Sequence, residues 1–542
     1  MQMIQKIQRM RTLYRWLFEP ISIPLWGSLL LWFGTITGMI IWIEQLTPIT
    51  EASFCFMDAV LWVDGLINYW YGGIVSGQME GDRPPLSLWM GAWLLSFGYT
   101  EVQALQLVAR VALSTTVATV FVGLIRRTSV VVMGLSCWLM LSSASFSKLM
   151  LWLNAEMLVN AFFVLHLFVG WYTIDAFQKD DRRWLKRGSL FVMGLLAGWT
   201  LCAKEQGILL LPVSVLLMST LTIRDRLSWV KQVLQRVVWY GLGLIAPLAW
   251  YGVHFREQWT NGEKWRIFID DLRIMFSQDS LSDQLNASTT WGTFSARFGH
   301  SDSWWGFFQS ASSSLLQEFL TPTLYAVVTF LGTLLITGVW NRFQRESDTS
   351  WHIDWRGGVW VFGHLLPVLP LLLVPIFEPY HYSVMWVPVV VLLAWTAQQW
   401  MGQWKLKGVL PVVLIGFLAS EGSTFKRTIR LERERCIATR LIPVRMWMRQ
   451  NAKDRSTLWV TDSLTPYDRS LYPHRAKDFS RYTTCSSQDY VATSGLSNQS
   501  ALFSAERERS PARWTKVNSI VSINKEVWQI FQADCQKDSQ NR

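Results

Sequence analysis

Long apolar blocks alternate with short polar connectors along most of the chain. A helix that crosses the hydrocarbon core of a bilayer needs about 20 mainly apolar residues. The blocks are continuous and lack the alternation of lipid-facing strands, so they predict membrane-spanning helices. The eleven predicted spans are Ile23–Leu46, Ala104–Ile125, Ser129–Phe146, Met157–Phe177, Gly188–Ala203, Gly207–Ile223, Val237–Phe255, Phe319–Trp340, Val359–Phe377, Tyr382–Trp400 and Val409–Phe425.

Composition agrees with this pattern. The 542 residues are 51% apolar and 16% charged, whereas soluble proteins carry roughly 25% charged residues. The 33 Trp residues are typical of side chains at a lipid–water boundary. A disordered or disulfide-stapled chain is excluded, and the 6 Cys lack metal or redox spacing. The predicted fold class is an all-α polytopic membrane protein.

Lys and Arg residues gather in alternate connectors, which predicts the orientation. The basic connectors hold Lys6, Arg9, Arg11, Arg15, Arg126, Arg127, Lys179, Arg182, Arg183, Lys186, Arg187, Arg224, Arg226, Lys231, Arg236, Arg342, Arg345, Arg356, Lys405 and Lys407. The opposite connectors, apart from the long loop Arg256–Glu318, hold only Arg83, Lys148 and Lys204. The positive-inside rule then places the amino terminus in the cytoplasm. The net charge of +11 therefore indicates orientation and not a nucleic-acid partner.

Two domains are predicted. Residues 1–425 form the transmembrane domain, with external loops at 47–103 and 256–318, and residues 426–542 form a soluble C-terminal domain. Basic residues directly after Phe425 favour the cytoplasm, but long domains escape the charge rule, so we expect this domain in the periplasm.

Two segments of the C-terminal domain have recognisable patterns. Thr457–Thr461 predicts a short strand and Glu526–Cys535 predicts a closing helix. Together they indicate a small α/β appendage, in which no catalytic motif is visible.

Carboxylates with candidate chemistry lie on the predicted outer side. Asp58 lies in an apolar run, where partial desolvation strengthens proton binding and suits a general base. The alternative for Asp58 is an interfacial Asp that caps a helix, which is also our interpretation of Asp64. Glu156 opens a span as a second acidic group, and its alternative is a first-turn Glu that complements the helix dipole.

Basic side chains near the same face could bind a phosphate. Arg83 precedes Pro84-Pro85, a rigid corner at the lipid boundary, and its alternative is snorkelling to headgroups. Lys204 lies at the mouth of a tight hairpin, and its alternative is a solvated turn.

Two further ionisable residues each have a functional and a structural interpretation. Arg110 lies inside an apolar span and must face protein or an aqueous cavity, with a structural ion pair as the alternative. His381, in the polar segment Glu378–Tyr382, could donate to a phosphate or shuttle a proton, or be an interfacial His with an ordinary hydrogen bond.

These residues follow one another in a characteristic order. The order runs through Asp58, Arg83-Pro84-Pro85-Leu86 with Trp89, Phe97-Gly98 with Glu101 and Arg110, Glu156, the glycine-rich run Gly194–Lys204, and Glu378–Pro388. Over Trp42–Trp400 the chain resembles the GT-C superfamily of polyprenyl-phosphate-sugar-dependent glycosyltransferases. It is most similar to the branch of protein O-mannosyltransferases and lipid A aminoarabinose transferases.

Three positions depart from the pattern of that family. Asp58 is followed by Ala59 where many relatives have paired acids, Glu156 stands where Asp is commoner, and His381 stands where relatives often have Arg. These departures bear on the substrate and on the metal requirement.

The resemblance implies an integral-membrane glycosyltransferase of the inner (plasma) membrane with its active site on the periplasmic or extracellular face. It would transfer a hexosyl or pentosyl group, with inversion, from a polyprenyl phosphate to a lipid, glycan or protein acceptor. Besides these substrates the expected partners are membrane lipids, with no nucleic acid.

The resemblance also implies roles for the site residues. Asp58 would act as base and Glu156 would assist it, and a divalent cation (Mg or Mn), if one is used, would lie between these acids and the phosphate. Arg83 and Lys204 would bind the phosphate, with Arg110 and His381 as weaker candidates. No other cofactor is expected.

A transporter or flippase is the alternative. It would use Asp58, Arg110 and Glu156 as an ion or substrate relay, with charges deep in the spans, broken helices and an internal repeat. The sequence shows no repeat and places most of these charges at one face, which favours transfer at the outer surface.

Overall fold

The computed structural model describes the chain in segments. They are residues 19–46, 66, 86–99, 101–143, 146, 149, 156–179, 182–203, 207–208, 210–223, 228–260, 326–336, 354–365, 383–403, 444, 447–448, 450–452, 457–460, 476–478, 489–494, 513–521 and 527–534.

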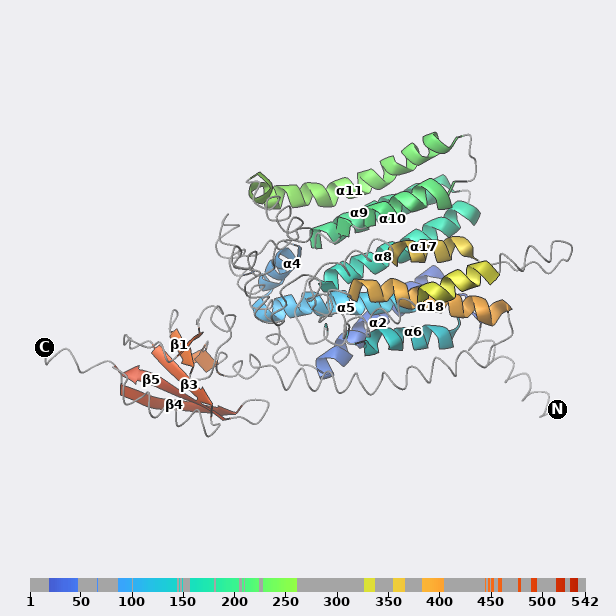
Figure 1. The fold of residues 1–542 in the computed structure, drawn as a ribbon. Coiled ribbons are helices and arrows are strands. Elements are labelled where there is room, and N and C mark those ends of the chain that lie inside the picture. Colours follow the sequence, from blue (N-terminus) through green and yellow to red (C-terminus); the bar gives the residue numbers. More distant parts are fainter. Residues whose placement is uncertain are drawn as a thin grey trace, which may run out of the picture.

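The first part of the described chain is helical (Figure 1). Its labelled helices are α2 (Leu25–Leu46), α4 (Leu86–Leu95), α5 (Glu101–Ile125), α6 (Val130–Ser142), α8 (Glu156–Lys179), α9 (Arg183–Ala203), α10 (Leu210–Leu216), the π-helix η2 (Leu217–Leu221), α11 (Trp229–Thr260), α17 (Trp355–Leu365) and α18 (Ser383–Gln403). A short apolar helix covers Ala326–Ile336. Every predicted span coincides at least in part with a helix except Val409–Phe425, which lies outside the described residues.

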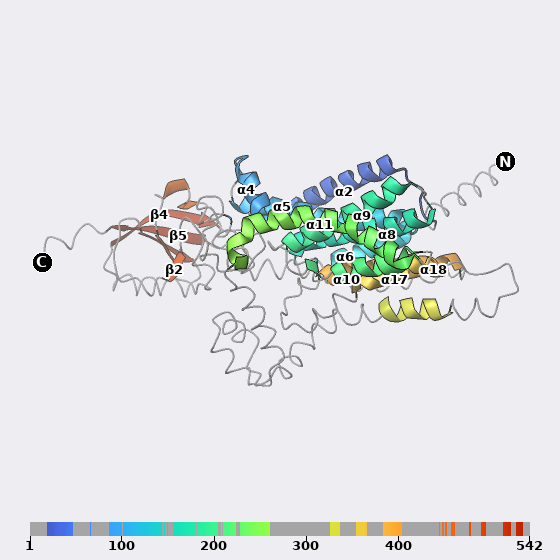
Figure 2. The ribbon, with the colours of Figure 1, turned by 90° about the horizontal axis from the view of Figure 1, so that it is seen from above.

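Among the described helices, 4 are long and apolar enough to cross a bilayer by length and composition: Trp26–Gln45, Gln103–Ile125, Met157–Gln178 and Trp229–Val253. The spans of α5 and α8 are each 72% buried, whereas those of α2 and α11 are 11% and 17% buried. Figure 2 accordingly shows α5 and α8 between α2 on one side and α17 and α18 on the other. The count of eleven spans remains a prediction.

The peripheral helices expose apolar side chains. On α2, Trp26 and Leu30 are 68% and 64% exposed, and on α11, Leu234 and Ile245 are 61% and 58% exposed. Large apolar surfaces are costly in water but stable against lipid chains. The exposed faces of α2 and α11 therefore support a membrane location for the bundle.

Glycines bring α9 and α11 into close contact. A Cβ added to Gly194 would overlap the Tyr240 carbonyl oxygen, and one added to Gly198 would lie 2.8 Å from Pro247 Cβ. Gly243 of α11 faces the Phe191 carbonyl in the same way. Small residues spaced four apart allow such backbone approach between membrane helices. The glycine-rich run Gly194–Lys204 therefore has a packing role at its start.

A buried chain of polar side chains links α8, α10 and α17. His364 Nδ1 lies 2.9 Å from the Trp360 carbonyl oxygen, so this nitrogen is the donor and Nε2 the acceptor. His166 Nδ1 then donates to His364 Nε2 at 3.2 Å. His166 Nε2 lies 2.9 Å from the Ser214 hydroxyl, which donates to the Leu210 carbonyl oxygen at 2.9 Å. This network links the three helices.

The described C-terminal residues form a five-stranded mixed sheet in the order β2-β1-β3-β5-β4. The strands are β1 (Thr457–Val460), β2 (Ala476–Asp478), β3 (Asp489–Ser494), β4 (Arg513–Val521) and β5 (Val527–Asp534). β1 pairs in parallel with β2 and β3, and β5 pairs antiparallel with β3 and β4. The strand predicted at Thr457–Thr461 is confirmed by β1.

The predicted closing helix over Glu526–Cys535 is wrong, because these residues contain β5. Trp528 and Ile530 are 1% and 0% exposed and pack with Leu458 of β1 and Tyr490 of β3. β-Branched and aromatic residues at alternate positions fit a half-buried pleated surface. Pairing with β3 and β4 supplies the hydrogen bonds that a local pattern does not reveal.

The sheet has its own small core, separate from the core of the helices. Figures 1 and 2 show it beyond the end of the bundle at which α4 lies and α5 begins. We call this the outer end, and the opposite one, where α5 ends, the inner end.

Candidate functional site

Most of the predicted site residues lie outside the described part of the chain. These are Asp58, Arg83, Lys204 and His381. Glu156 is the first residue of α8, and its side chain is likewise outside the description. The geometry of the candidate site therefore comes from the described residues that flank these positions.

Arg110 is the predicted site residue whose side chain is described. It lies inside α5 with a side chain 6% exposed and forms an ion pair with Glu44 of α2. This contact is the structural alternative that the sequence leaves open. The sequence gives no signal for Glu44, because its pairing with Arg110 depends on the packing of α2 against α5.

A cluster of three indoles joins the chain after Arg83 to the chain before Lys204. The ring centroids of Trp89 on α4 and Trp250 on α11 are 5.7 Å apart. Trp250 also contacts Trp199 on α9, with centroids 5.4 Å apart. α4 begins three residues after Arg83 and α9 ends one residue before Lys204. The tryptophan cluster thus packs α4, α9 and α11 together.

A second contact concerns the segment after Asp58. Leu66 is fully buried, and a Cβ added to Gly91 of α4 would lie 3.2 Å from its side chain and 3.0 Å from that of Leu105 on α5. Gly91 therefore provides the space in which the Leu66 segment, α4 and α5 meet.

A third contact joins the starts of α8 and α18. Asn160 Nδ2 donates to the Ser383 hydroxyl at 2.8 Å, and both residues are fully buried. Asn160 lies one turn after Glu156, and Ser383 follows His381 by two residues. The Asn160 Oδ1 atom has no hydrogen-bond partner among the described residues. Sequence analysis missed both residues, because a neutral Asn and Ser carry no signal until their helices are placed together.

Metal ligands are not grouped in the described ranges. No set of three His, Cys, Asp or Glu side chains there is arranged to hold a metal ion. The pair of acids predicted for a cation, Asp58 and Glu156, has side chains outside those ranges.

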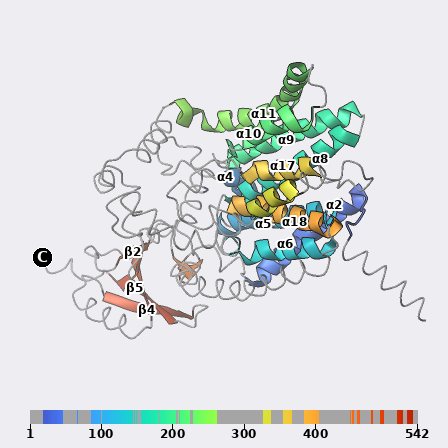
Figure 3. The same ribbon diagram turned by 45° about the vertical axis from the view of Figure 1, so that its right-hand side comes forward.

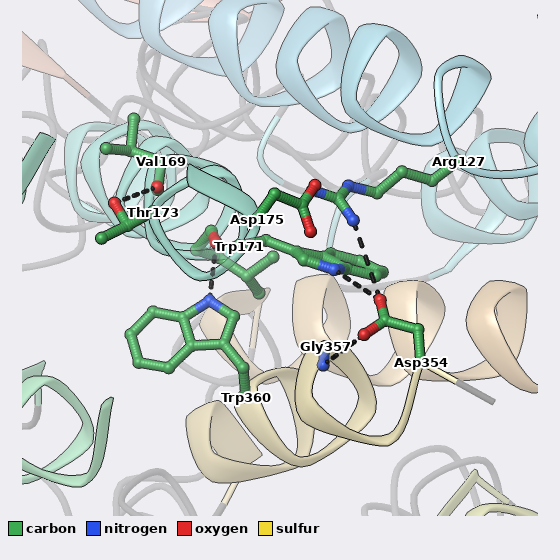
Figure 4. Close-up of polar contacts among 9 residues, drawn as sticks. Arg127, Val169, Trp171, Thr173, Asp175, Asp354, Gly357 and Trp360 are labelled. Carbon is green, nitrogen blue, oxygen red and sulfur yellow. Dashed lines mark hydrogen bonds and ion pairs between the residues drawn. The ribbon is translucent and has the colours of Figure 1, made fainter. Parts of the chain in front are cut away.

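The inner end of the bundle has a different arrangement, centred on Arg127 (Figure 4). Arg127 donates to Asp175 at 2.7 Å and lies 3.8 Å from Asp354. Its guanidinium carbon is 4.1 Å from the centroid of the Trp171 ring. Trp171 Nε1 donates to Asp354 at 3.1 Å, and the other Asp354 oxygen accepts from the Gly357 backbone at 3.0 Å.

This Arg127 cluster joins helix ends that are far apart in the sequence. Arg127 follows α5, Asp175 lies near the end of α8, and Asp354 precedes α17. Ser129, before α6, also donates to Gln398 near the end of α18 at 2.8 Å. Burial lowers the pKa of the Arg127 guanidinium, although the Asp175 and Asp354 carboxylates favour its charged form. The cluster holds the connectors that the sequence predicts to be cytoplasmic at one common end.

Comparison with known proteins gives a fold-level likeness. No protein-family model and no curated protein matches the chain. Among solved structures, it is similar to ArnT from Cupriavidus metallidurans bound to undecaprenyl phosphate, with 10% identity, a TM-score of 0.46 and coverage of 94% of this chain and 98% of that one. For the apo state of the same protein the identity is 11%, the TM-score 0.46 and the coverage 93% and 98%. A likeness of this size assigns neither a family nor an activity to the chain.

Proposed function

We propose that the protein is a membrane glycosyltransferase that transfers a sugar from a polyprenyl-phosphate donor to a lipid, glycan or protein acceptor. The proposal rests on the ordered motifs of the sequence and on the membrane character of the helices. Its site lies at the outer end of the bundle, on the periplasmic or extracellular side of the inner membrane.

One structural observation carries the proposal: contacts beside the predicted site residues gather at the outer end. In the sequence, Trp89 and Trp199 of the tryptophan cluster are six residues after Arg83 and five before Lys204. Asn160 and Ser383, which share a hydrogen bond, are four residues after Glu156 and two after His381. These contacts come from separate helices. A site built from separate helices needs such packing to bring its acids and cations together.

The proposed reaction is a direct displacement at the anomeric carbon. Asp58 takes the proton of the acceptor hydroxyl as its oxygen forms the new bond to the sugar. The bond between the sugar and the phosphate oxygen breaks, and its electron pair leaves with the polyprenyl phosphate. Arg83 and Lys204 stabilise the charge that develops on this leaving group, with His381 as a further candidate. A single displacement inverts the anomeric configuration.

A divalent cation would be held by Asp58 and Glu156. It would add positive charge beside the phosphate. Glu156 otherwise orients Asp58 or the acceptor.

The transporter alternative has one observation in its favour, the His166–His364 pair in the interior of the bundle. The two rings lie in direct contact and link α8 to α17, so we interpret the pair as a packing feature. An activity assay also separates the two functions, since only a transferase releases polyprenyl phosphate.

The test of the proposed function is the Asp58→Asn variant. Purified protein is incubated with a panel of polyprenyl-phosphate sugars and acceptors, and released polyprenyl phosphate is measured. Loss of the base should lower turnover by about 10²–10⁴-fold, while Asp64→Asn, a matched change in the same segment, should keep the wild-type rate. Equal rates for both variants would remove Asp58 from the base role.

The phosphate assignment is examined in the same assay. Arg83→Ala and Lys204→Ala should weaken donor binding. Unchanged donor affinity in both variants would refute the phosphate-binding role of Arg83 and Lys204. Absence of polyprenyl phosphate release with every donor, together with flux of a lipid-linked substrate in proteoliposomes, would favour the transporter instead.

A further inference from the structure

A pocket of about 1160 Å³ opens at the inner end, between α2, α5, α8, α17 and α18. Figure 3 shows these helices side by side. Arg127, with its partners Asp175 and Asp354, forms part of the wall. This inner pocket lies at the opposite end from the proposed catalytic site and has no role in the proposed reaction.

The inner pocket is lined by three arginines and two aspartates, so its charged side chains sum to +1. Arg126 is exposed and Arg356 is half-buried, and within the described ranges neither has an ion-pair partner. The pocket's carboxylates are already engaged, since Asp175 binds Arg127 and Asp354 accepts from Trp171 and Gly357. Arg126 and Arg356 are therefore available to bind an anion.

The remaining walls of the pocket are suited to a hydrocarbon chain. Val122 of α5 and Phe168 of α8 line it together with Leu29 of α2, which is 50% exposed on the lipid-facing helix. Trp32 closes part of the wall through a hydrogen bond of 2.9 Å to Thr119. A site with cations and with an apolar wall that reaches the lipid-facing surface fits an amphiphile better than a soluble ion.

We propose that the inner pocket binds an anionic glycerophospholipid of the cytoplasmic leaflet, with its phosphate between Arg126 and Arg356 and an acyl chain along Leu29, Val122 and Phe168. The cytoplasmic leaflet supplies anionic lipids at the depth of such a pocket, and basic pockets between membrane helices bind their headgroups. The bound lipid packs between α2 and the α5–α8 centre of the bundle.

The test measures lipid retention by native mass spectrometry on the full-length protein. Phosphatidylglycerol and phosphatidylcholine of equal chain length are added to delipidated protein. The wild type should retain phosphatidylglycerol selectively, and the double variant Arg126→Gln/Arg356→Gln should bind it about 30-fold more weakly, roughly fivefold for each arginine. Arg183→Gln, a basic residue of the same end that does not line the pocket, should behave as the wild type.

A second variant separates the hydrocarbon contact from the charge. Val122→Trp adds volume to the apolar wall and should reduce retention of phosphatidylglycerol with both arginines in place. Thermal unfolding without lipid should be the same for all variants, which shows that they fold.

Four results would overturn the proposal. Equal retention of the two phospholipids, or unchanged selectivity in the double variant, would show that the arginines do not select the headgroup. Displacement by free glycerol phosphate at the same concentration would assign the pocket to a soluble anion. Preference for polyprenyl phosphate over phosphatidylglycerol would assign it to the carrier of the proposed donor.

Discussion

Arg126 and Arg127 are neighbours in the sequence with opposite surroundings. Arg127 lies over the Trp171 ring and donates to Asp175, whereas Arg126 is exposed. The sequence treats both as cations of one connector. Only the contacts at the inner end show that Arg127 holds helices together while Arg126 remains available to a ligand.

This difference makes a prediction at the residue scale. Arg127→Gln should lower the free energy of unfolding by about 1–3 kcal/mol, because it leaves the Asp175 and Asp354 carboxylates close together without their cation. The measurement is thermal or denaturant unfolding in lipid-free detergent. Arg126→Gln is the matched control and should change stability by less than about 0.5 kcal/mol. Equal effects of the two changes on stability would contradict the role of Arg127 in holding the helices together.

At the scale of elements, two glycines of α9, Gly188 and Gly194, have different environments. Gly194 faces the Tyr240 carbonyl oxygen of α11, while Gly188, on the same helix, has nothing within 4 Å of an added Cβ. Close packing of α9 against α11 therefore depends on Gly194 and not on Gly188.

Gly194→Ala should therefore destabilise the protein by about 1–3 kcal/mol through overpacking. Gly188→Ala should be neutral or stabilising by up to about 1 kcal/mol, because Ala is the better helix former. Denaturant unfolding of both variants in one detergent provides the comparison. A Gly194→Ala protein as stable as the Gly188→Ala protein would show that α9 and α11 do not approach through this face.

One segment of the C-terminal domain forms a different element from the one that its local sequence predicts. The segment Glu526–Cys535 has the length of a short helix, yet β5 forms there because β3 and β4 pair with both of its edges. Strand pairing is non-local, so a single segment does not reveal it.

At the scale of the whole molecule, the described connectors separate into two ends. The connectors predicted as cytoplasmic meet at the inner end, around Arg127 and the Ser129–Gln398 hydrogen bond. The segments that flank the predicted catalytic residues meet at the outer end. The positive-inside rule predicts that the inner end faces the cytoplasm.

The orientation is testable by cysteine accessibility. In a variant lacking the 6 native Cys, Tyr99→Cys at the outer end should react with a membrane-impermeant maleimide in right-side-out vesicles. Arg183→Cys at the inner end should react only after permeabilisation. Both positions are exposed, Tyr99 by 43%, so burial does not limit labelling. The reverse labelling pattern would place the proposed catalytic end in the cytoplasm.

The sequence by itself determined the helical class, the positions of most spans and the alternation of basic connectors. It could do so because hydropathy and charge act residue by residue against a bilayer. The candidate residues Asp58, Arg83, Glu156, Lys204 and His381 likewise came from the order of motifs, and they remain predictions because their side chains lie outside the described ranges.

Only the tertiary structure decided which groups meet. Arg127 and Asp175 are 48 residues apart, Asn160 and Ser383 are 223 apart, and no spacing rule relates either pair. The partner of Arg110, the tryptophan cluster and the inner pocket arise in the same way. Each depends on which helix faces pack together, and that choice is made by the whole bundle and not by any one segment.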